Sequence, residues 1–173
     1  MPKNENIENI LGTVACALLV TFLATVVPYR MISSESHTVL LQLNPVRSLG
    51  PFLIVLGILG YLLCFSNFIL DAKGTPLPLG TQKHLIVKGL YRYVRNPIYI
   101  SWYLILLGEA FFFRSLDLLL YLLIWVFFFH FKVVFSEEPS LRNQFGESYE
   151  QYCRAVPRWI PRLKLAEKGS KQA

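Results

Sequence analysis

Two glutamates stand side by side directly after a long apolar stretch, at Glu137 and Glu138. Carboxylates in this position can accept hydrogen bonds from ribose hydroxyls or from an ammonium group. A purely structural role explains the pair equally well, because the helix dipole stabilises an acidic residue in a first helical turn by about 0.3–1 kcal/mol. The pair is therefore a candidate binding site with an open structural alternative.

A second polar cluster occupies residues 89–99, with the sequence GLYRYVRNPIY. Arg92 and Arg95 can hold a carboxylate or a phosphate, and the tyrosines can stack on a flat ring. The alternative is the basic, aromatic flank of an ordinary membrane helix. Composition alone does not decide between a binding site and such a flank.

His130 lies seven residues before Glu137, so the two side chains share a face if the helix between them is continuous. The imidazole can then order a substrate or act as a base near neutral pH, or simply bind a neighbouring helix. The three histidines and three cysteines lack the spacing of metal ligands. GxGxxG, P-loop, HExxH and GxSxG motifs are also absent, so we expect no metal and no standard soluble-enzyme site.

The composition indicates an integral membrane protein. Of the 173 residues, 54% are hydrophobic and only 16% are charged, against about 25% charged residues in soluble domains. The net charge of +6 does not indicate nucleic-acid binding, because the chain has no basic stripe with interleaved aromatics on a polar surface.

The apolar residues gather in stretches long enough, or nearly so, to cross a bilayer core about 30 Å thick. Glu109 interrupts the third stretch and is interpreted as structural, because it is far from the polar clusters. Arg114 and Ser115 leave room only for a tight turn before the fourth stretch. The predicted spans are residues 10–29, 49–70, 97–113 and 116–135.

Four spans place the N-terminus, the 71–96 segment and the C-terminal segment on one side of the membrane. That side carries fourteen of the seventeen lysines and arginines. The positive-inside rule then makes both termini cytoplasmic, in the inner membrane if the protein is bacterial.

An amphipathic helix is predicted after the fourth span, where large apolar residues recur every three or four positions. We expect a single membrane domain over residues 1–165 and a disordered, lysine-rich tail over 166–173. The predicted fold class is all-α, a polytopic membrane protein with four transmembrane helices and this cytoplasmic C-terminal helix. The apolar stripe consists of Leu141, Phe145, Tyr149, Tyr152 and Val156.

Taken together, these motifs resemble the isoprenylcysteine carboxyl methyltransferase-like family of integral membrane proteins, which is related to the phospholipid N-methyltransferases. The order and spacing of the motifs across two spans make the resemblance specific, and their pattern is similar to a bacterial-type branch. The matching motifs are GTP at 74–76, LIVxGLY at 85–91, RNPIY at 95–99, GE at 108–109, His130, EEPxL at 137–141, FGxxYxxY at 145–152 and VPRWxP at 156–161.

The resemblance implies an S-adenosylmethionine-dependent methyltransferase with a cofactor site in residues 74–162, at the cytoplasmic end of the last two spans. It implies a lipophilic acceptor that enters from the bilayer. We assign catalytic roles to Arg95, which helps to position the donor, and to His130, which would orient or deprotonate the acceptor. The expected cofactor-binding residues are His84, Leu85, Ile86, Tyr91, Asn96, Pro97, Ile98, Tyr99, Glu137 and Glu138.

Two positions depart from the prenylcysteine enzymes. Asn96 stands where those enzymes have histidine, and Val133 stands where they carry an arginine near the substrate carboxylate. Three interpretations therefore remain open: methyl transfer to a lipophilic carboxylate, a phospholipid-type N-methyltransferase, and a non-enzymatic membrane protein that retains the fold. The sequence does not name the acceptor.

Overall fold

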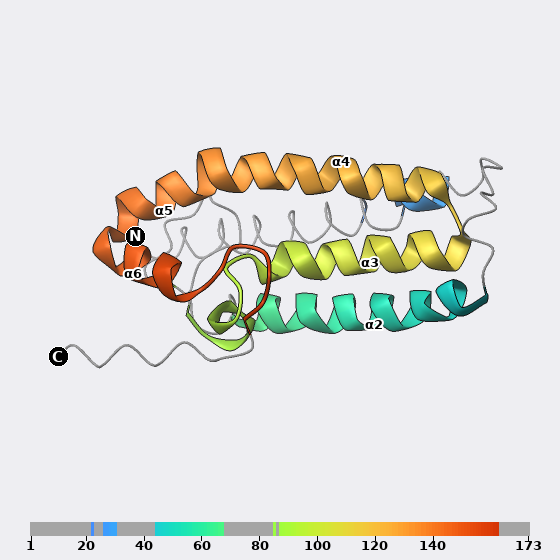
Figure 1. Cartoon of the computed structure of the whole chain (residues 1–173), viewed down its shortest axis with the longest axis horizontal. Coiled ribbons are helices and arrows are strands. Elements are labelled where there is room, and N and C mark those ends of the chain that lie inside the picture. The colour runs from blue at the N-terminus through green and yellow to red at the C-terminus, as the bar shows by residue number, and fades with distance from the viewer. Residues whose placement is uncertain (1–21, 23–25, 31–43, 68–84, 86, 163–173) are drawn as a thin grey trace, which may run out of the picture.

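The computed structural model describes residues 22, 26–30, 44–67, 85 and 87–162 (Figure 1). All regular elements in these ranges are helical, as the composition predicted. The first predicted span, the 71–84 loop and the tail lie largely or wholly outside the described residues. The elements are α2 (Asn44–Asn67), the 3₁₀ turn η3 (Gly89–Arg92), α3 (Pro97–Phe113), α4 (Leu116–Lys132), the π-helical turn η4 (Val133–Glu137), α5 (Glu138–Phe145) and α6 (Glu147–Ala155).

Two of the described helical runs are long and apolar enough to cross a membrane, Pro45–Ser66 and Leu116–Phe145. The predicted third span coincides with α3, which is apolar but shorter. These helices are consistent with association with a membrane. The count of four spans and their orientation stay predictions.

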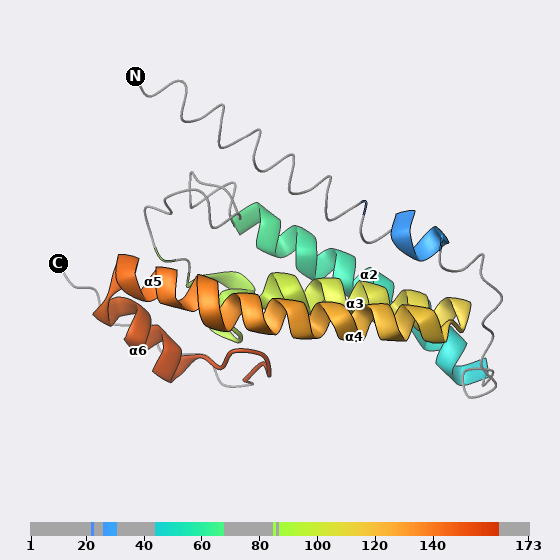
Figure 2. The same cartoon turned by 90° about the horizontal axis from the view of Figure 1, so that it is seen from above.

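Helices α2, α3 and α4 lie side by side along the long axis of the molecule (Figures 1 and 2). The tight turn predicted between α3 and α4 is present: Arg114 adopts a left-handed φ of 57°, and the Ser115 hydroxyl accepts a hydrogen bond from the Leu118 N–H at 3.3 Å. This hydroxyl caps α4, as serine commonly does. Because the turn reverses the chain, the start of α3 lies at the same end of the bundle as the end of α4.

Helices α2 and α3 approach each other closely through glycines. A Cβ atom on Gly57 would lie 2.6 Å from the Ser101 carbonyl oxygen, and one on Gly108 would lie 2.7 Å from the Gly50 carbonyl oxygen. Small residues at such contacts let two membrane helices pack backbone against backbone. The glycines therefore fix the distance between α2 and α3.

The substitution Gly108→Leu is expected to force α2 and α3 apart. Overpacking of this kind costs about 1–3 kcal/mol, because neither backbone can move without losing its other contacts. A thermal unfolding experiment in detergent should show a lower midpoint than for the wild type. Leu59→Ala on the exposed face of α2 is the control and should unfold near the wild-type temperature. Equal midpoints for both variants would contradict this packing.

An aromatic cluster joins α3 to α4. Trp102 is buried and meets Trp125 edge to face, with 5.0 Å between the ring centroids. Phe129 stacks on Trp125 at 5.2 Å and on Tyr99 at 4.4 Å. Aromatic pairs in these geometries add about 0.5–1.5 kcal/mol beyond their buried area. The cluster thereby fixes the side of α3 on which Tyr99 lies.

The helix that begins at Leu116 continues through η4 into α5. In η4 the Glu138 N–H bonds to the Val133 carbonyl, an i→i+5 bond in place of the usual i→i+4 bond. The prediction that His130 and Glu137 share one helix face assumed 3.6 residues per turn from residue 130 to residue 137. The wider π turn rotates Glu137 relative to His130, so this assumption does not hold. Residues five apart meet instead, so Lys132 reaches Glu137.

The predicted amphipathic segment consists of two helices, α5 and α6, where one was expected. Gly146 ends α5 with a positive φ of 52°, a conformation that glycine adopts without strain. The apolar stripe nevertheless gathers in one cluster, in which buried Tyr149, Tyr152 and Val156 pack against Leu141 and Phe145. The cytoplasmic surface position of this segment stays a prediction.

Candidate functional site

Most of the polar side chains named above gather at one end of the bundle, called the polar end below. It comprises η3, the start of α3, the end of α4, α5, α6 and the C-terminal segment 156–162 (Figures 1 and 2). The C-terminal segment returns to the loop that precedes α3. The Arg95 N–H donates to the Pro157 carbonyl at 2.9 Å, and the Arg162 N–H donates to the Tyr93 carbonyl at 3.0 Å. The last described residues thus close over the start of α3.

The first polar group at this end is centred on Glu137. The Tyr99 hydroxyl and the Lys132 ammonium both donate to Oε1 of Glu137, and Lys132 Nζ also lies 3.1 Å from the Tyr99 oxygen. Both contacts fall on Oε1, so neither occupies Oε2. The side chain is mostly buried without being sealed from solvent. This arrangement offers a fixed carboxylate oxygen to a ligand that carries hydroxyl or ammonium groups.

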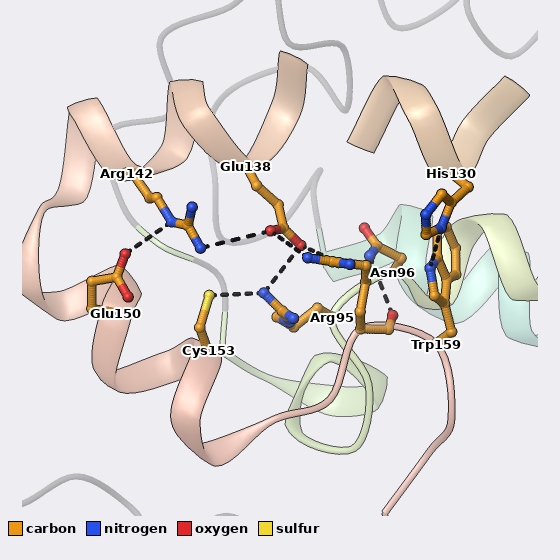
Figure 3. Close-up of polar contacts among 9 residues, drawn as sticks. Arg95, Asn96, His130, Glu138, Arg142, Glu150, Cys153 and Trp159 are labelled. Carbon is orange, nitrogen blue, oxygen red and sulfur yellow. Dashed lines mark hydrogen bonds and ion pairs between the residues drawn. The ribbon is translucent and has the colours of Figure 1, made fainter. Parts of the chain in front are cut away.

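The second polar group is centred on Glu138, which is only 3% exposed (Figure 3). Arg158 binds it with both ends of the guanidinium fork, Nε to Oε1 at 2.6 Å and Nη2 to Oε2 at 3.0 Å. Arg95 Nη1 lies 3.1 Å from Oε1. The hydrogen bond to Glu138 raises the pKa of Arg158 above its ordinary value. Glu138 therefore ties the C-terminal segment and the loop before α3 to α5.

Arg95 and Asn96 make further contacts that hold α6 and the C-terminal segment at the start of α3 (Figure 3). Arg95 Nη1 donates to the Cys153 sulfur at 2.8 Å, and Asn96 Nδ2 donates to the Arg158 carbonyl at 3.2 Å. The Tyr152 hydroxyl donates to the Tyr91 carbonyl at 2.8 Å. Burial raises the pKa of Tyr152, so this hydroxyl stays protonated and acts as the donor.

The substitution Tyr152→Phe is expected to loosen η3 without changing the apolar packing of α6. Loss of one intramolecular hydrogen bond costs about 0.5–1.5 kcal/mol. Thermal unfolding in detergent measures the change. Tyr29→Phe, at a tyrosine that is 74% exposed, is the matched control and should be neutral. Identical stability of the two variants would contradict a structural role for this bond.

An apolar pocket of about 430 Å³ lies between α3, α4 and the C-terminal segment. The Trp159 indole N–H donates to His130 Nδ1 at 3.1 Å (Figure 3). The Trp159 ring also lies 6.4 Å from the Tyr99 ring, whose hydroxyl binds Glu137. Trp159 thus stands between the pocket and the Glu137 group. The pocket is lined by Ile100, Tyr103, Val126, Phe127, His130 and Trp159.

The structure brings many of the predicted site residues together at the polar end. His130 joins them through Trp159, although it does not share a partner with Glu137. Leu85 packs against the Tyr149 cluster, and Pro97 is buried at the start of α3 next to half-buried Ile98. His84 and Ile86 lie outside the described residues. The members in mutual or shared contact are Arg95, Asn96, Tyr99, Glu137 and Glu138.

Sequence reasoning missed several residues of this end. Lys132 was not singled out from the sequence, because its contact with Glu137 depends on the π turn. Arg158 and Trp159 stood inside the VPRWxP motif, which contributed only to the family resemblance. That motif was the available signal, because Arg158 and Trp159 are adjacent in it and the same resemblance includes Glu137 and Glu138. Tyr103 had no signal beyond its position on α3.

A family model described as phospholipid methyltransferase matches residues 46–148 of the chain. The match covers more than half of the sequence, and the chain belongs to this family. Over 83 residues it is also 39% identical to the protein-S-isoprenylcysteine O-methyltransferase of Schizosaccharomyces pombe (strain 972 / ATCC 24843). The aligned part is 46% of this chain and 34% of the yeast protein, so the chain spans about a third of the length of the curated relative it matches.

These similarities confirm the family that the motifs indicated. The motifs resembled the isoprenylcysteine carboxyl methyltransferase-like proteins, which are related to the phospholipid N-methyltransferases. The family model matches the second of these groups, and the similar protein from Schizosaccharomyces pombe is named for the first. The assignment to a bacterial-type branch stays a prediction.

Proposed function

We propose that the chain is an S-adenosylmethionine-dependent membrane methyltransferase that moves a methyl group to a lipophilic acceptor. Family membership and the name of the yeast relative support the class. The observation that carries the proposal is the position of the Glu137 group beside an apolar pocket, with Trp159 between them. A polar donor and an apolar acceptor need such neighbouring sites.

The residues at the polar end fit the methyl donor chemically. The donor carries ribose hydroxyls and an ammonium group, both of which can bind Oε2 of Glu137. Tyr91 in η3, Asn96 before α3 and Tyr99 in α3 are all half-buried at this end. When bound, this cofactor supplies an electrophilic methyl group on a sulfonium. We propose that the donor is held by Glu137, Tyr99, Asn96, Tyr91, Leu85, Pro97 and Ile98, together with His84 and Ile86.

Glu138 has a different role in this proposal. Both of its oxygens are bound by Arg158, and one is also bound by Arg95. We infer that Glu138 and Arg95 position the C-terminal segment over the site and act on the cofactor only through it. The segment excludes water, which strengthens electrostatic attraction within the closed site.

Alignment of the two substrates is the main catalytic contribution that these residues can make. Good positioning alone can supply about 7–11 kcal/mol of a barrier. Tyr99 is fixed twice, through its hydroxyl on Glu137 and through its ring on Phe129. The donor site therefore has a rigid wall on the side that faces α4.

The acceptor would enter the pocket from the bilayer. Phe127 lines the pocket and is 56% exposed, so one wall lies on the outer surface of α4. With four spans and both termini cytoplasmic, the polar end faces the cytosol and receives the water-soluble donor there. The domain extends over residues 1–165, with its cofactor half in 74–162. A phospholipid-type N-methyltransferase remains the second candidate, on the strength of the family match.

Calorimetric titration of the purified protein in detergent with S-adenosylmethionine tests the donor assignment. We expect saturable binding near one equivalent per chain. S-adenosylhomocysteine, which lacks the methyl group and the positive charge, should compete for the same site. A folded sample that binds neither compound would contradict the proposal and favour a non-enzymatic member of the family.

A further inference from the structure

The ammonium group of Lys132 is held against both Glu137 and Tyr99, the two residues at the centre of the proposed donor site. It donates to Oε1 of Glu137 and lies 3.1 Å from the Tyr99 hydroxyl oxygen. It also lies 5.7 Å from the centroid of the Tyr99 ring, within the range of a cation–π contact. Because Lys132 binds Oε1, it fixes the carboxylate of Glu137 and leaves Oε2 for a ligand.

The π turn makes this contact possible. In a regular α-helix, residues five apart point about 140° away from each other, so positions 132 and 137 would lie on different faces. In η4 the Glu138 N–H bonds instead to the Val133 carbonyl, and the wider turn brings Lys132 over Glu137. Single π turns inside α-helices are frequent at functional sites. The helix is thus irregular at the place where a cation meets the donor-site carboxylate.

The charge of Lys132 offsets the charge of Glu137. The two side chains are only 31% and 16% exposed, so water screens them incompletely. Charges in such a position interact through an effective dielectric constant of about 20, against about 80 in bulk water. The next carboxylate, Glu138, is bound by Arg158 and Arg95. Both glutamates at this end are therefore compensated by cations.

The donor and the product of methyl transfer differ by one methyl group and one positive charge. As the methyl leaves, the electron pair of the S–CH₃ bond stays on sulfur and a lone pair of the acceptor forms the new bond, so a sulfonium becomes a neutral thioether. An uncompensated carboxylate would hold the sulfonium more tightly than the thioether. A cation on that carboxylate removes this preference, and it disfavours a charge that has partly gone in the transition state, which is where differential binding accelerates a reaction.

We propose that Lys132 is a positioning residue for Glu137 that also sets the preference of the site between donor and product. Its charge cancels that of Glu137, so S-adenosylhomocysteine binds at least as tightly as S-adenosylmethionine. This inference rests on the proposed function and adds the regulation of the same site. Methyl transfer slows as the thioether accumulates, and sustained turnover depends on a second reaction that consumes it.

Calorimetric titration with both compounds tests the role of Lys132 through the ratio of the two dissociation constants. The two compounds differ only in the methyl group and the charge, so a purely structural defect weakens both and leaves the ratio unchanged. We expect Lys132→Met to shift the ratio roughly ten-fold towards S-adenosylmethionine, the order of effect for one unit charge near a protein surface. Lys132→Arg keeps the charge and should keep the wild-type ratio. The titrations are run at pH 8, where a carboxylate that has lost its lysine stays ionised.

Two further variants complete the experiment. Arg154→Met removes the same charge from an exposed position on α6 and should leave the ratio unchanged. Lys132→Gln keeps a hydrogen-bond donor without the charge, and it replaces Lys132→Met if that variant does not fold.

The outcomes separate this inference from the proposed function. A wild type that binds S-adenosylmethionine much more tightly than S-adenosylhomocysteine would overturn the inference alone, as would an unchanged ratio in a folded neutral variant of Lys132. An equal shift in Arg154→Met would also overturn it, because the effect would then not depend on the contact with Glu137. A folded wild type that binds neither compound would contradict the proposed function instead.

Discussion

The substitution Glu138→Gln is expected to lower the free energy of unfolding by about 3 kcal/mol, since removing one partner of a buried ion pair leaves the other charge uncompensated. Glu138 is 3% exposed, and the Arg95 side chain beside it is 11% exposed. Arg158 is 31% exposed and recovers part of its hydration, which places the loss at the lower end of the usual range. The largest effect should fall on the C-terminal segment, which Arg158 ties to α5.

Two measurements check this prediction. Thermal unfolding in detergent reports the global change, and limited tryptic digestion should cut Glu138→Gln faster at Arg158 and Arg162. Glu150→Gln is the control at an exposed pair: Glu150 pairs with Arg142 at 2.8 Å, and both side chains are about half exposed, although Arg142 also lies 3.9 Å from Oε2 of Glu138. An exposed pair of this kind contributes about 0–1 kcal/mol. Equal losses of stability in the two variants would show that the burial of Glu138 does not determine the size of the loss, and would contradict this prediction.

The substitution Glu137→Gln is expected to weaken S-adenosylmethionine binding roughly 10- to 100-fold, because a hydrogen bond to a charged group contributes about 1.5–3 kcal/mol. The amide also loses the charge that holds Lys132 and the Tyr99 hydroxyl. Calorimetry measures the dissociation constant directly. Tyr99→Phe keeps the ring and should weaken binding by a smaller factor.

Glu147→Gln provides the control for this series. It makes the same change of charge in the first turn of α6, where Glu147 accepts an exposed contact from Gln151. Its affinity for the donor should match the wild type. Unchanged binding in both Glu137→Gln and Tyr99→Phe would exclude the Glu137 group as the donor site.

Hydropathy and local signals predicted the helical hairpin well. Pro97 marked the first residue of α3, and the pair Arg114 and Ser115 marked the turn, because both signals act within a few residues of the chain. The π turn was not predictable in the same way. Its i→i+5 bonding leaves no periodic signature, so the predicted shared face of His130 and Glu137 did not follow.

The candidate site was predicted as a set of motifs, without its pairings. The sequence placed Arg95 and Glu138 in the same neighbourhood through the family resemblance, but their contact joins residues from two separate elements. Local periodicity carries no information on such long-range pairs. Trp159 shows the same limit: the sequence placed it in the VPRWxP motif, and only the fold brings its indole to His130.

The central claim is most directly tested by methyl transfer itself. The purified protein, in detergent with an extract of membrane lipids, is given S-adenosylmethionine labelled in its methyl group, and radioactivity in the organic phase is followed over time. We predict time-dependent label in that phase, strongly reduced in Glu137→Gln and retained in Glu147→Gln. A folded wild-type protein that binds the donor but transfers no label above a heat-treated control, with extracts of several membranes, would contradict the account.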